Sequence, residues 1–575
     1  MNKRWLIKEN PDNQTMQFLA QKLQIDPILS NLLTQRGINN FHEAQAFFRP
    51  KLEALHDPFL MKNMNQAVER LQNAITQQEK VLLFGDYDVD GTTAVAVLWN
   101  ILSPLLKGLD YYIPDRYREG YGISKDGIDF AKSQGFKVII ALDCGIKANT
   151  LVDYAKSLNI DFIICDHHEP GSNIPDAIVL DPKQIDCPYP FKELSGCGVG
   201  FKLMQALFII EKWNFEILYR QLDLLAISIA ADLVPVVGEN RIFCHFGLEI
   251  INKSPRLCFQ EMLIEAKKQL PLTLTNVVFI IAPRINAAGR IDEGKKAVKL
   301  MISEDRNEIR TTVKSIEDDN IERRKLDKII TEEALNLLKT DSHFHTKMTT
   351  VVFQADWHKG VIGIVASRLI EQYYRPTIVL TESNNKLTGS ARSILGINIY
   401  EVLAACEDHL EQFGGHAFAA GMTLNPEKLI DFTNQFEIEV QKRISPAEMI
   451  PIQEVDHELL FDDLFKAGEN IYEIPKFKRI LKQLEPHGPE NMKPVFVSKN
   501  VYVENVQLLK ELHLKLSLSQ PHCPLEIQAI GFNLKDKIDL ALSKEPLDIL
   551  YTLEINSWNN QERLQLNLKD IRPSL

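Results

Sequence analysis

Three aspartates alternate with other residues directly after a short apolar run near residue 80. Asp86, Asp88 and Asp90 follow KVLLFG, and Gly91 permits a tight turn into the next segment. Alternate acids on an extended loop project to the same side, so two or three carboxylates can meet one cation. An N-cap and turn cluster is the competing interpretation, because Asp is common before helices. A calcium loop is excluded, since Val97 stands at the twelfth position, where that loop needs a Glu.

Two further apolar runs also end in residues that can bind a metal. One ends at Asp143 in LDCG, and the next ends at Asp166, His167 and His168. In an open parallel sheet, ligands bind outside the carboxyl ends of the strands. A lone Asp at a strand end is commonly a turn residue, and a His pair often caps a helix. Three such ends without a basic partner in any of the motifs favour a shared metal site.

A fourth acid, Asp232, follows the apolar run LLAISIAA. An unpaired carboxylate is costly to bury there, and coordination to a cation removes that cost. Carboxylate oxygens with one imidazole nitrogen suit manganese or magnesium better than calcium or zinc. Two such ions about 3.5–4 Å apart can hold a water and stabilise both the attacking and the leaving oxygen. The residues therefore predict a two-metal phosphodiesterase.

The surrounding pattern predicts the elements that carry these side chains. Four apolar runs are typical of buried parallel strands, at 80–86, 137–145, 161–168 and 177–182. Helical stretches separate most of them, including TTAVAVLWNILSPLL after the first, which indicates βαβ units. The polar stretch from 304 to 340 lacks Gly and Pro and predicts one long solvated helix. A second α/β pattern follows, and short alternating runs after 456 predict a β-barrel such as an OB-fold.

The predicted fold class is therefore α/β, with two α/β lobes joined by a long helix and a C-terminal OB-like β-barrel. The expected parts are a helical extension (1–72), a catalytic α/β domain (73–303), a connector helix (304–340), a second α/β domain (341–455) and the barrel domain (456–575). A chain of 575 residues is too long for one core, which agrees with several domains.

Composition limits the classes of function. The formal net charge of −12 argues against a protein that coats nucleic acid by bulk charge, but it allows a local basic groove. No run approaches eighteen apolar residues, and the start lacks an apolar signal region, so neither a membrane span nor export is expected. The eight cysteines are scattered without a CxxC and indicate reduced thiols in a cytoplasmic protein.

The chain resembles the DHH phosphoesterase superfamily in four ordered motifs: DYDVDG, LDCG, DHH and AADLVP. Within it, the chain is most similar to the bacterial exonucleases that degrade single-stranded DNA from 5′ to 3′. This likeness covers nearly the whole chain and includes PDRYREGYG, GCGVGFKL, PRINAAGR, WHKGVIGIVASRL, GSARS, GGHAFAAG and HGPENMKP. The resemblance implies a DHH domain, a DHH-associated domain (DHHA1) and an OB-fold that binds single strands.

The resemblance also assigns roles to the acidic cluster. One ion would be held by Asp90, Asp143, His167 and Asp232. The other would be held by Asp88 and Asp143, with Asp86 as a further candidate, so that Asp143 bridges the two ions. Some relatives have a His where this chain has Phe84, which predicts a weaker or more hydrated second ion. Asp166 would orient a neighbouring ligand. His168 would steady the scissile phosphate or protonate the leaving oxygen.

The second lobe supplies the expected phosphate contacts. GGH and GSARS are interpreted as compact turns whose backbone amides approach a phosphate, with Ser390, Arg392 and His416 opposite the metals. Arg116 and Arg290 are the other phosphate-clamp candidates. Simple tight turns are the alternative for GGH, and a helix-capping role is the alternative for His358.

The implied reaction is two-metal hydrolysis of single-stranded DNA to 5′-mononucleotides, in DNA repair and recombination. A single-strand-binding protein and a helicase are the candidate protein partners, and no membrane partner is expected. One alternative is a phosphodiesterase that acts on short oligonucleotides, nucleotide bisphosphates or cyclic dinucleotides. Another is a catalytically silent DNA-binding scaffold, which the complete acid and histidine set argues against. The sequence does not choose between manganese and magnesium.

Overall fold

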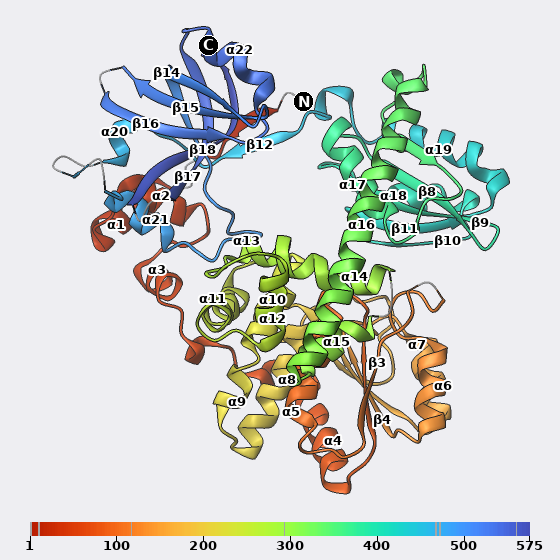
Figure 1. Cartoon of the computed structure of the whole chain (residues 1–575). Helices are drawn as coiled ribbons and strands as arrows, with labels where there is room; N and C mark the ends of the chain where they lie inside the picture. The colour runs from red at the N-terminus through yellow and green to blue at the C-terminus, as the bar shows by residue number, and fades with distance from the viewer. Residues whose placement is uncertain are drawn as a thin grey trace.

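A five-stranded parallel sheet forms the centre of the first lobe in the computed structural model (Figure 1). The structure describes residues 3–9, 12–116, 118–291, 294–465, 469–470, 473–521, 523–558 and 561–574. The strand order is β3-β2-β4-β5-β6, with β2 (Val81–Gly85), β3 (Leu109–Tyr112), β4 (Val138–Leu142), β5 (Asp161–Cys165) and β6 (Ile178–Leu180). The four predicted strands are confirmed. The sequence missed β3, because this edge strand has no fully buried residue.

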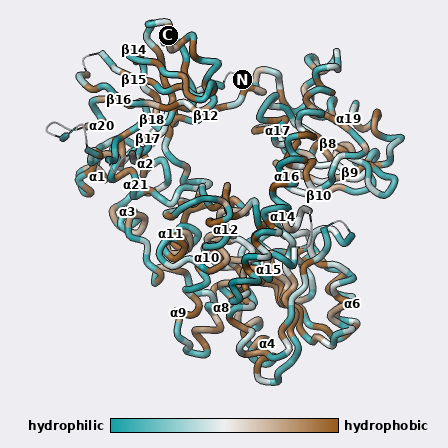
Figure 2. Tube along the Cα trace, in the orientation of Figure 1, coloured by the Kyte–Doolittle hydropathy of each residue, from teal (hydrophilic) through white to brown (hydrophobic). Residues whose placement is uncertain are grey.

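The order of the strands reverses between β2 and β4. The chain passes from β2 outward to β3 and then returns to β4 on the other side of β2. Such a switch point leaves a crevice at the carboxyl ends of the two central strands. Both faces of the sheet are covered by apolar cores. Figure 2 shows the hydrophobic residues concentrated along these strands and the helices beside them.

Helices form the rest of the first lobe. Helix α5 begins within the first acidic motif, directly after Asp88, and nearly all of its residues are buried. The segment Val277–Ile281 is a π-helix between α13 and α14. The helices are α4 (Met64–Gln77), α5 (Val89–Leu102), α6 (Lys125–Gln134), α7 (Asn149–Ser157), α8 (Gly196–Glu211), α9 (Phe215–Tyr219), α10 (Leu222–Asp232), α11 (Gly238–Lys253), α12 (Leu257–Glu265), α13 (Leu274–Asn276), α14 (Ala282–Ile291) and α15 (Lys295–Ile302).

The predicted connector helix is confirmed as α16 (Arg306–Thr340), which runs from the first lobe to the second (Figure 1). The second lobe has a mixed sheet in the order β10-β11-β9-β8-β7. Its strands are β7 (Thr350–Phe353), β8 (Thr377–Ser383), β9 (Lys386–Arg392), β10 (Gln412–Gly415) and β11 (Ala419–Leu424). Its helices are α17 (Ile362–Tyr373), α18 (Ile399–Ala404) and α19 (Leu429–Gln441).

The C-terminal part is a closed barrel, because β14 pairs with both β15 and β17. The OB-like expectation is confirmed. Its strands are β14 (Phe496–Leu509), β15 (His513–Gln520), β16 (Cys523–Gly531), β17 (Leu547–Trp558) and β18 (Gln561–Pro573). The elements around it are β12 (Ile452–Val455), β13 (His457–Glu458), α20 (Phe461–Leu464), α21 (Lys476–Lys482) and α22 (Ile538–Leu542).

The N-terminal segment packs against the barrel. Strand β1 (Arg4–Ile7) pairs in parallel with β12, and α1 (Asn13–Leu23), α2 (Pro27–Thr34) and α3 (Phe41–Phe48) contribute to the apolar core of the barrel. The sequence predicted the helices but missed β1, whose four residues are mostly exposed. The numerical limits of the five predicted parts remain a prediction.

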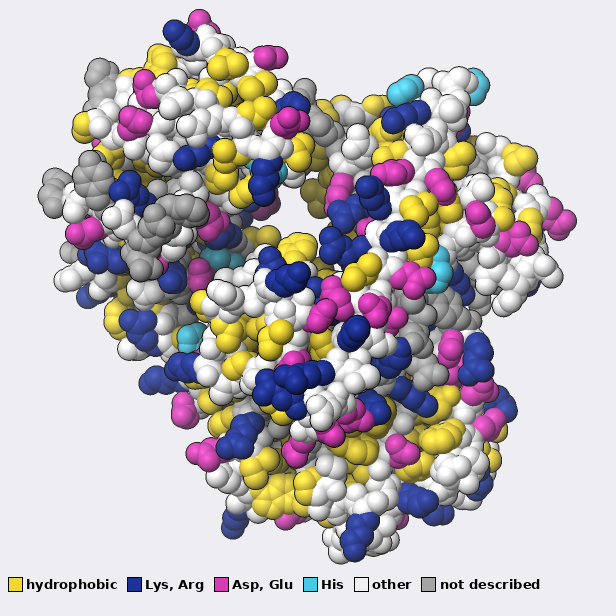
Figure 3. All heavy atoms as spheres, in the orientation of Figure 1, with side chains coloured by type: hydrophobic (Ala, Val, Ile, Leu, Met, Phe, Trp, Pro, Cys, Tyr) yellow, Lys and Arg dark blue, Asp and Glu magenta, His cyan; other side chains and the backbone are white. Residues whose placement is uncertain are grey.

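The two lobes and the barrel surround an opening. Figure 3 shows this opening, with Lys and Arg side chains gathered on the side that α16 forms. Within the described ranges, no helix is both long enough and apolar enough to span a bilayer.

Candidate metal centre

The first acidic motif is divided between a loop and a helix. Asp86 follows β2 directly, and its Oδ1 accepts a hydrogen bond from Gly122 N at 3.3 Å. Asp88 is the N-cap of α5 and accepts from Gly91 N at 3.1 Å. Asp90 already lies in the first helical turn, so the expected extended loop across all three acids is wrong. The helix starts early because Asp88 caps it, and the capping and metal-binding interpretations both fit this residue.

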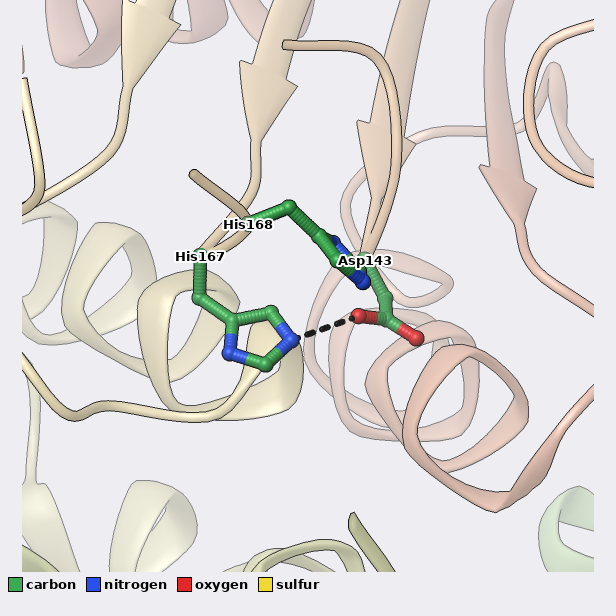
Figure 4. A group of neighbouring side chains, drawn as sticks. All are labelled: Asp143, His167 and His168. Atoms are coloured by element: carbon green, nitrogen blue, oxygen red, sulfur yellow. Dashed lines mark ion pairs between the residues drawn. The ribbon is translucent and has the colours of Figure 1, made fainter. Parts of the chain in front are cut away.

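The other predicted ligands meet at the same crevice. Asp143 follows β4 and has a φ of 61°, which turns its side chain away from the strand direction. His167 follows β5, and its Nε2 lies 3.2 Å from Asp143 Oδ1 (Figure 4). Asp232 is the last residue of α10, and its Oδ2 lies 3.6 Å from the same nitrogen. With Asp90 Oδ2 at 3.8 Å, acids from three separate segments therefore converge on one imidazole.

The side chains form two adjoining groups with metal-binding geometry. Within each group, one ligand atom per residue lies within 4.8 Å of the others. The groups are Asp90, His167 and Asp232, and Asp86, Asp88 and Asp143. A third combination joins Asp143 and His167 to His168, which the sequence analysis did not consider as a ligand. This arrangement fits two ions that share Asp143.

Several polar atoms of this cluster are buried without a hydrogen-bond partner. They are Asp86 Oδ2, Asp143 Oδ1, and both ring nitrogens of His167. Unpaired polar atoms in the interior cost about 1–3 kcal/mol each. Coordination would satisfy all of them at once, so the residues fit a divalent cation.

The electrostatics of the cluster also fit a bound divalent cation. Burial and the neighbouring carboxylates raise the pKa values of Asp86, Asp88, Asp143 and Asp232. Burial lowers the pKa of His167 to about 4, so its imidazole is neutral at pH 7, which is the form that binds metals. A divalent cation would relieve the repulsion between these carboxylates. The oxygen-rich donor set with imidazole nitrogen suits manganese or magnesium.

Asp166 holds the histidine pair in place. Its Oδ1 lies 2.7 Å from His168 Nδ1 and accepts from His167 N at 2.7 Å, while its Oδ2 accepts from Ile146 N at 2.9 Å. Burial lowers the pKa of His168, but the Asp166 carboxylate outweighs it and raises that pKa to about 9. The Asp166 bond occupies Nδ1 and leaves Nε2 facing the crevice. Tyr121, which the sequence analysis did not single out, has its hydroxyl oxygen 3.0 Å from that nitrogen.

The second lobe reaches the metal cluster through His416. Its ring stacks on His168 with centroids 5.6 Å apart and an interplanar angle of 16°. Ser390 and Arg392 lie in β9, so the expectation of a compact turn at GSARS is wrong. At GGH, Gly415 ends β10 and His416 begins the tight turn to β11, in which His416 N donates to Ala419 O at 2.8 Å. The residues of β9 alternate between buried and half-buried, which is the period of a strand. Because of this period, Ser390 and Arg392 share one face, and Arg392 Nη1 donates to Ser390 Oγ at 3.0 Å.

Arg392 belongs to a group of cations without acidic partners. Burial and the charge of Arg116 lower the pKa values of both Arg392 and Lys359. Arg116 lies over the Tyr87 ring at 4.9 Å. Within the described part of the chain, none of the three cations forms an ion pair with a carboxylate. Lys359 lies in the WHKGVIG motif, and its sequence context alone predicts no role for it.

Three residues that the sequence pointed to remain to be placed: Arg290, His358 and Phe84. The side chain of Arg290 lies outside the described residues, although its backbone is in α14. His358 Nδ1 accepts from Gly360 N at 3.2 Å in the turn before α17, whose N-cap Val361 has no side-chain hydrogen bond, so this contact does not cap the helix. Phe84 is fully buried and stacks on Tyr112, so it faces the core and not the crevice.

We predict that Gly196→Ala lowers metal affinity and activity together. A Cβ at this position would lie 2.5 Å from Asp143 Cβ and 2.7 Å from its Cα, so the backbone that carries Asp143 must shift. We expect a loss of about 10–100-fold in Mn²⁺ affinity, the range seen when a ligand loses its support. Titration with Mn²⁺ monitored by electron paramagnetic resonance checks this. Gly198→Ala, on the same helix and with its nearest atom at 3.4 Å, an ordinary contact, is the control, and equal affinities for both variants would contradict the prediction.

Three domain families match this chain. The DHH family N-terminal domain covers residues 80–229, the DHHA1 domain covers 345–442, and the RecJ OB domain covers 472–570. The fold and the metal cluster thus define a phosphoesterase of the DHH class.

Full-length relatives narrow the class further. The single-stranded-DNA-specific exonuclease RecJ of Bacillus subtilis is 38% identical, over 99% of this chain and 70% of that protein. The crystal structure of RecJ from Thermus thermophilus with Mn²⁺ matches with a TM-score of 0.84 and 25% identity, over 100% of this chain and 80% of that one. A structure with Mg²⁺ from the same source has the same fold, with a TM-score of 0.78, 24% identity, and coverage of 100% and 79%. The chain belongs to the RecJ family.

Proposed function

We propose that this protein is a single-stranded-DNA-specific exonuclease that removes 5′-mononucleotides in the 5′ to 3′ direction by two-metal hydrolysis, in DNA repair and recombination. One observation carries the proposal: Arg116, whose charge acts on Asp86 of the metal-binding cluster and on Lys359 and Arg392, belongs with these two to a group of cations that form no ion pair with a carboxylate among the described residues. The relatives named as single-stranded-DNA-specific exonucleases support the substrate. A cytoplasmic location, and a single-strand-binding protein and a helicase as partners, belong to the same proposal.

The acidic cluster would bind two Mn²⁺ or Mg²⁺ ions. Asp90, Asp143, His167 and Asp232 would hold one, and Asp86, Asp88 and Asp143 would hold the other. When bound, such ions supply a hydroxide nucleophile and neutralise charge on the phosphate. Asp166 would fix the His168 ring through the Nδ1 contact of 2.7 Å. His168 Nε2 would then face the scissile phosphate and steady it or protonate the leaving oxygen.

The cation group would bind the phosphate at the 5′ end of the strand. The charge of Arg116 lowers the pKa values of Lys359 and Arg392, and an anion between these cations would relieve this repulsion. Ser390 and His416 would add hydrogen bonds from the second lobe, with Arg290 as a further contact. A terminal phosphate held here would leave the first phosphodiester at the metal cluster, which explains the proposed direction. The OB domain would bind the strand farther from its end.

The test is digestion of long single strands that carry a label at the 5′ or the 3′ end. With Mn²⁺ or Mg²⁺, the 5′ label is expected to appear at once as a mononucleotide, while the 3′ label stays in shortening fragments. Duplex DNA and dinucleotides are the comparison substrates. Early release of the 3′ label would reject the direction, and hydrolysis of dinucleotides alone would reject the exonuclease.

We predict that Arg392→Ala impairs the use of 5′-phosphorylated strands. Loss of a charged hydrogen bond of about 1.5–3 kcal/mol corresponds to about 10–100-fold in kcat/KM. Strands with a 5′-hydroxyl should show a much smaller effect, because they lack the group that Arg392 binds. Arg443→Ala, in the same lobe and paired with Glu439, is the matched control. An equal loss on both substrates would contradict a contact with the terminal phosphate.

A further inference from the structure

A separate cavity of about 510 Å³ lies where three distant segments of the chain meet. It is lined by residues that follow α3, by one face of α11 and the loop before α13, and by the end of α21 with residues 482–487. None of its lining residues belongs to the metal cluster or to the proposed phosphate clamp. Its volume falls within the range of about 300–1,000 Å³ that is typical of small-molecule sites.

The inner wall of this cavity holds a buried cation, Arg241, that forms no ion pair with a carboxylate in the described part of the chain. Arg241 is 4% exposed and stacks on the Phe47 ring at 3.7 Å. Its guanidinium donates to backbone carbonyl oxygens, including those of Leu484 and Glu485 at 2.9 Å each. Burial lowers the pKa of Arg241 to about 10, which keeps it charged at neutral pH. Carbonyl groups orient this charge but do not neutralise it.

Two more cations stand at the mouth of the cavity. Arg49 and Lys482 are exposed, and neither forms an ion pair with a residue in the described ranges. The lining acid Glu249 is already paired with Lys253, which lies outside the lining. Lys493 is likewise paired with Glu554 at 2.6 Å. Glu485 alone remains to balance three cations, so the site has a local positive charge on a protein whose net charge is −12.

The uncharged part of the lining is half apolar and half polar. Its polar residues are His245, Asn252, Thr273, Thr275, Gln483 and His487, and its apolar residues, which offer a wall for a flat ring, are Phe48, Pro50, Leu248, Leu272, Leu274 and Pro486. A ligand that combines an anionic group with an aromatic base would match both parts of the cavity. Inorganic phosphate would use only the cations, and an uncharged base would use only the apolar wall.

We propose that this cavity binds one nucleotide unit, with its phosphate beside Arg49 and Lys482 and its base against the apolar wall. The unit is either a free nucleotide or one residue of a strand, since both present the same chemistry. The residues that line the cavity come from the N-terminal segment, the first lobe and the segment just before the barrel. A bound nucleotide would therefore contact all three parts of the chain. This inference does not depend on the proposed exonuclease activity.

Calorimetric titration of the full-length protein with 5′-dAMP in EDTA tests the proposal. We expect saturable binding that Lys482→Glu weakens about tenfold or more, because an attraction becomes a repulsion. Lys476→Glu, on the same helix and outside the lining, should leave binding unchanged. Arg392→Ala should also retain it, which separates this site from the proposed clamp. Lys482 is exposed, so charge reversal there should not change the thermal unfolding midpoint.

Two outcomes would overturn the proposal. One is the absence of binding to the wild-type protein, and the other is equal binding by Lys482→Glu and the wild type. Competition then distinguishes the sources of the ligand. Displacement of 5′-dAMP by an oligothymidylate with a 5′-hydroxyl would indicate a strand residue, whereas its failure to compete would indicate a free nucleotide. Adenosine and inorganic phosphate should each bind more weakly than 5′-dAMP.

Discussion

Replacement of Asp143 by asparagine is expected to lower hydrolysis of single-stranded DNA by about three orders of magnitude or more, because metal ions contribute several kcal/mol to such reactions. Asp143 lies between the two metal-binding groups and is 2% exposed. Its Oδ1 has no hydrogen-bond partner and lies 3.2 Å from His167 Nε2. An amide keeps the shape of the side chain but removes the negative charge that both ions would share. We therefore expect loss of metal binding without loss of the fold.

Direct metal titration distinguishes a loss of metal binding from a general loss of folding in this variant. Mn²⁺ binding to Asp143→Asn, followed by electron paramagnetic resonance, should be lost or much weaker while the circular dichroism spectrum is unchanged. Asp153→Asn, at an exposed position on α7, is the control for an Asp to Asn change. Wild-type activity in Asp143→Asn would reject the two-metal mechanism, and normal Mn²⁺ binding would reject the bridging role.

The metal-binding cluster could be predicted from the sequence because most of its residues lie at the ends of strongly apolar strands. Residues Asp86, Asp143 and His167 each follow such a run closely, and parallel strands bring their carboxyl ends to one edge. Asp232 was predicted for a different reason, since a carboxylate beside a buried apolar run needs a partner. The backbone conformation of the first acidic motif was harder to predict. The early start of α5 at Val89 depends on the cap that Asp88 provides.

The proposed phosphate clamp was predicted less well, because its side chains meet only through tertiary structure. Ser390 and Arg392 were expected in a turn, but their small neighbours belong to a central strand between β8 and β11. A Cβ at Gly389 would lie 2.6 Å from the ends of the Leu380 and Met422 side chains, so both side chains would have to move. Lys359 had no pattern of its own, and only its proximity to Arg116 reveals the cation group. The pairing of β1 with β12, across most of the chain, also has no local signal.

Lys202→Met is expected to destabilise the first lobe by about 3–5 kcal/mol, the usual cost of breaking a buried ion pair from one side. The side chains of Lys202 and Glu239 are 0% and 1% exposed, and Nζ lies 2.9 Å from Oε1. The pair joins α8 to α11 and, through a bond from Nζ to His56 O at 2.7 Å, to the N-terminal segment. Without the ammonium group, Glu239 would remain as a buried carboxylate that has lost its counter-charge.

The double variant Lys202→Met/Glu239→Gln identifies the cause of this loss. Tyr189 and His56 contact different oxygens of Glu239, Oε2 at 2.5 Å and Oε1 at 3.0 Å. In glutamine, the oxygen would take the place of Oε1 and accept from His56 N, while the amide nitrogen would take the place of Oε2 and donate to the Tyr189 hydroxyl oxygen, so no buried charge remains. The double variant should therefore recover most of the lost stability, measured as urea unfolding with hydrogen exchange of α8 and α11. Lys125→Met removes an exposed pair with Asp129 and should have no measurable effect. If the double variant were as unstable as Lys202→Met, lost packing around the lysine chain would explain the defect, and the charge would not.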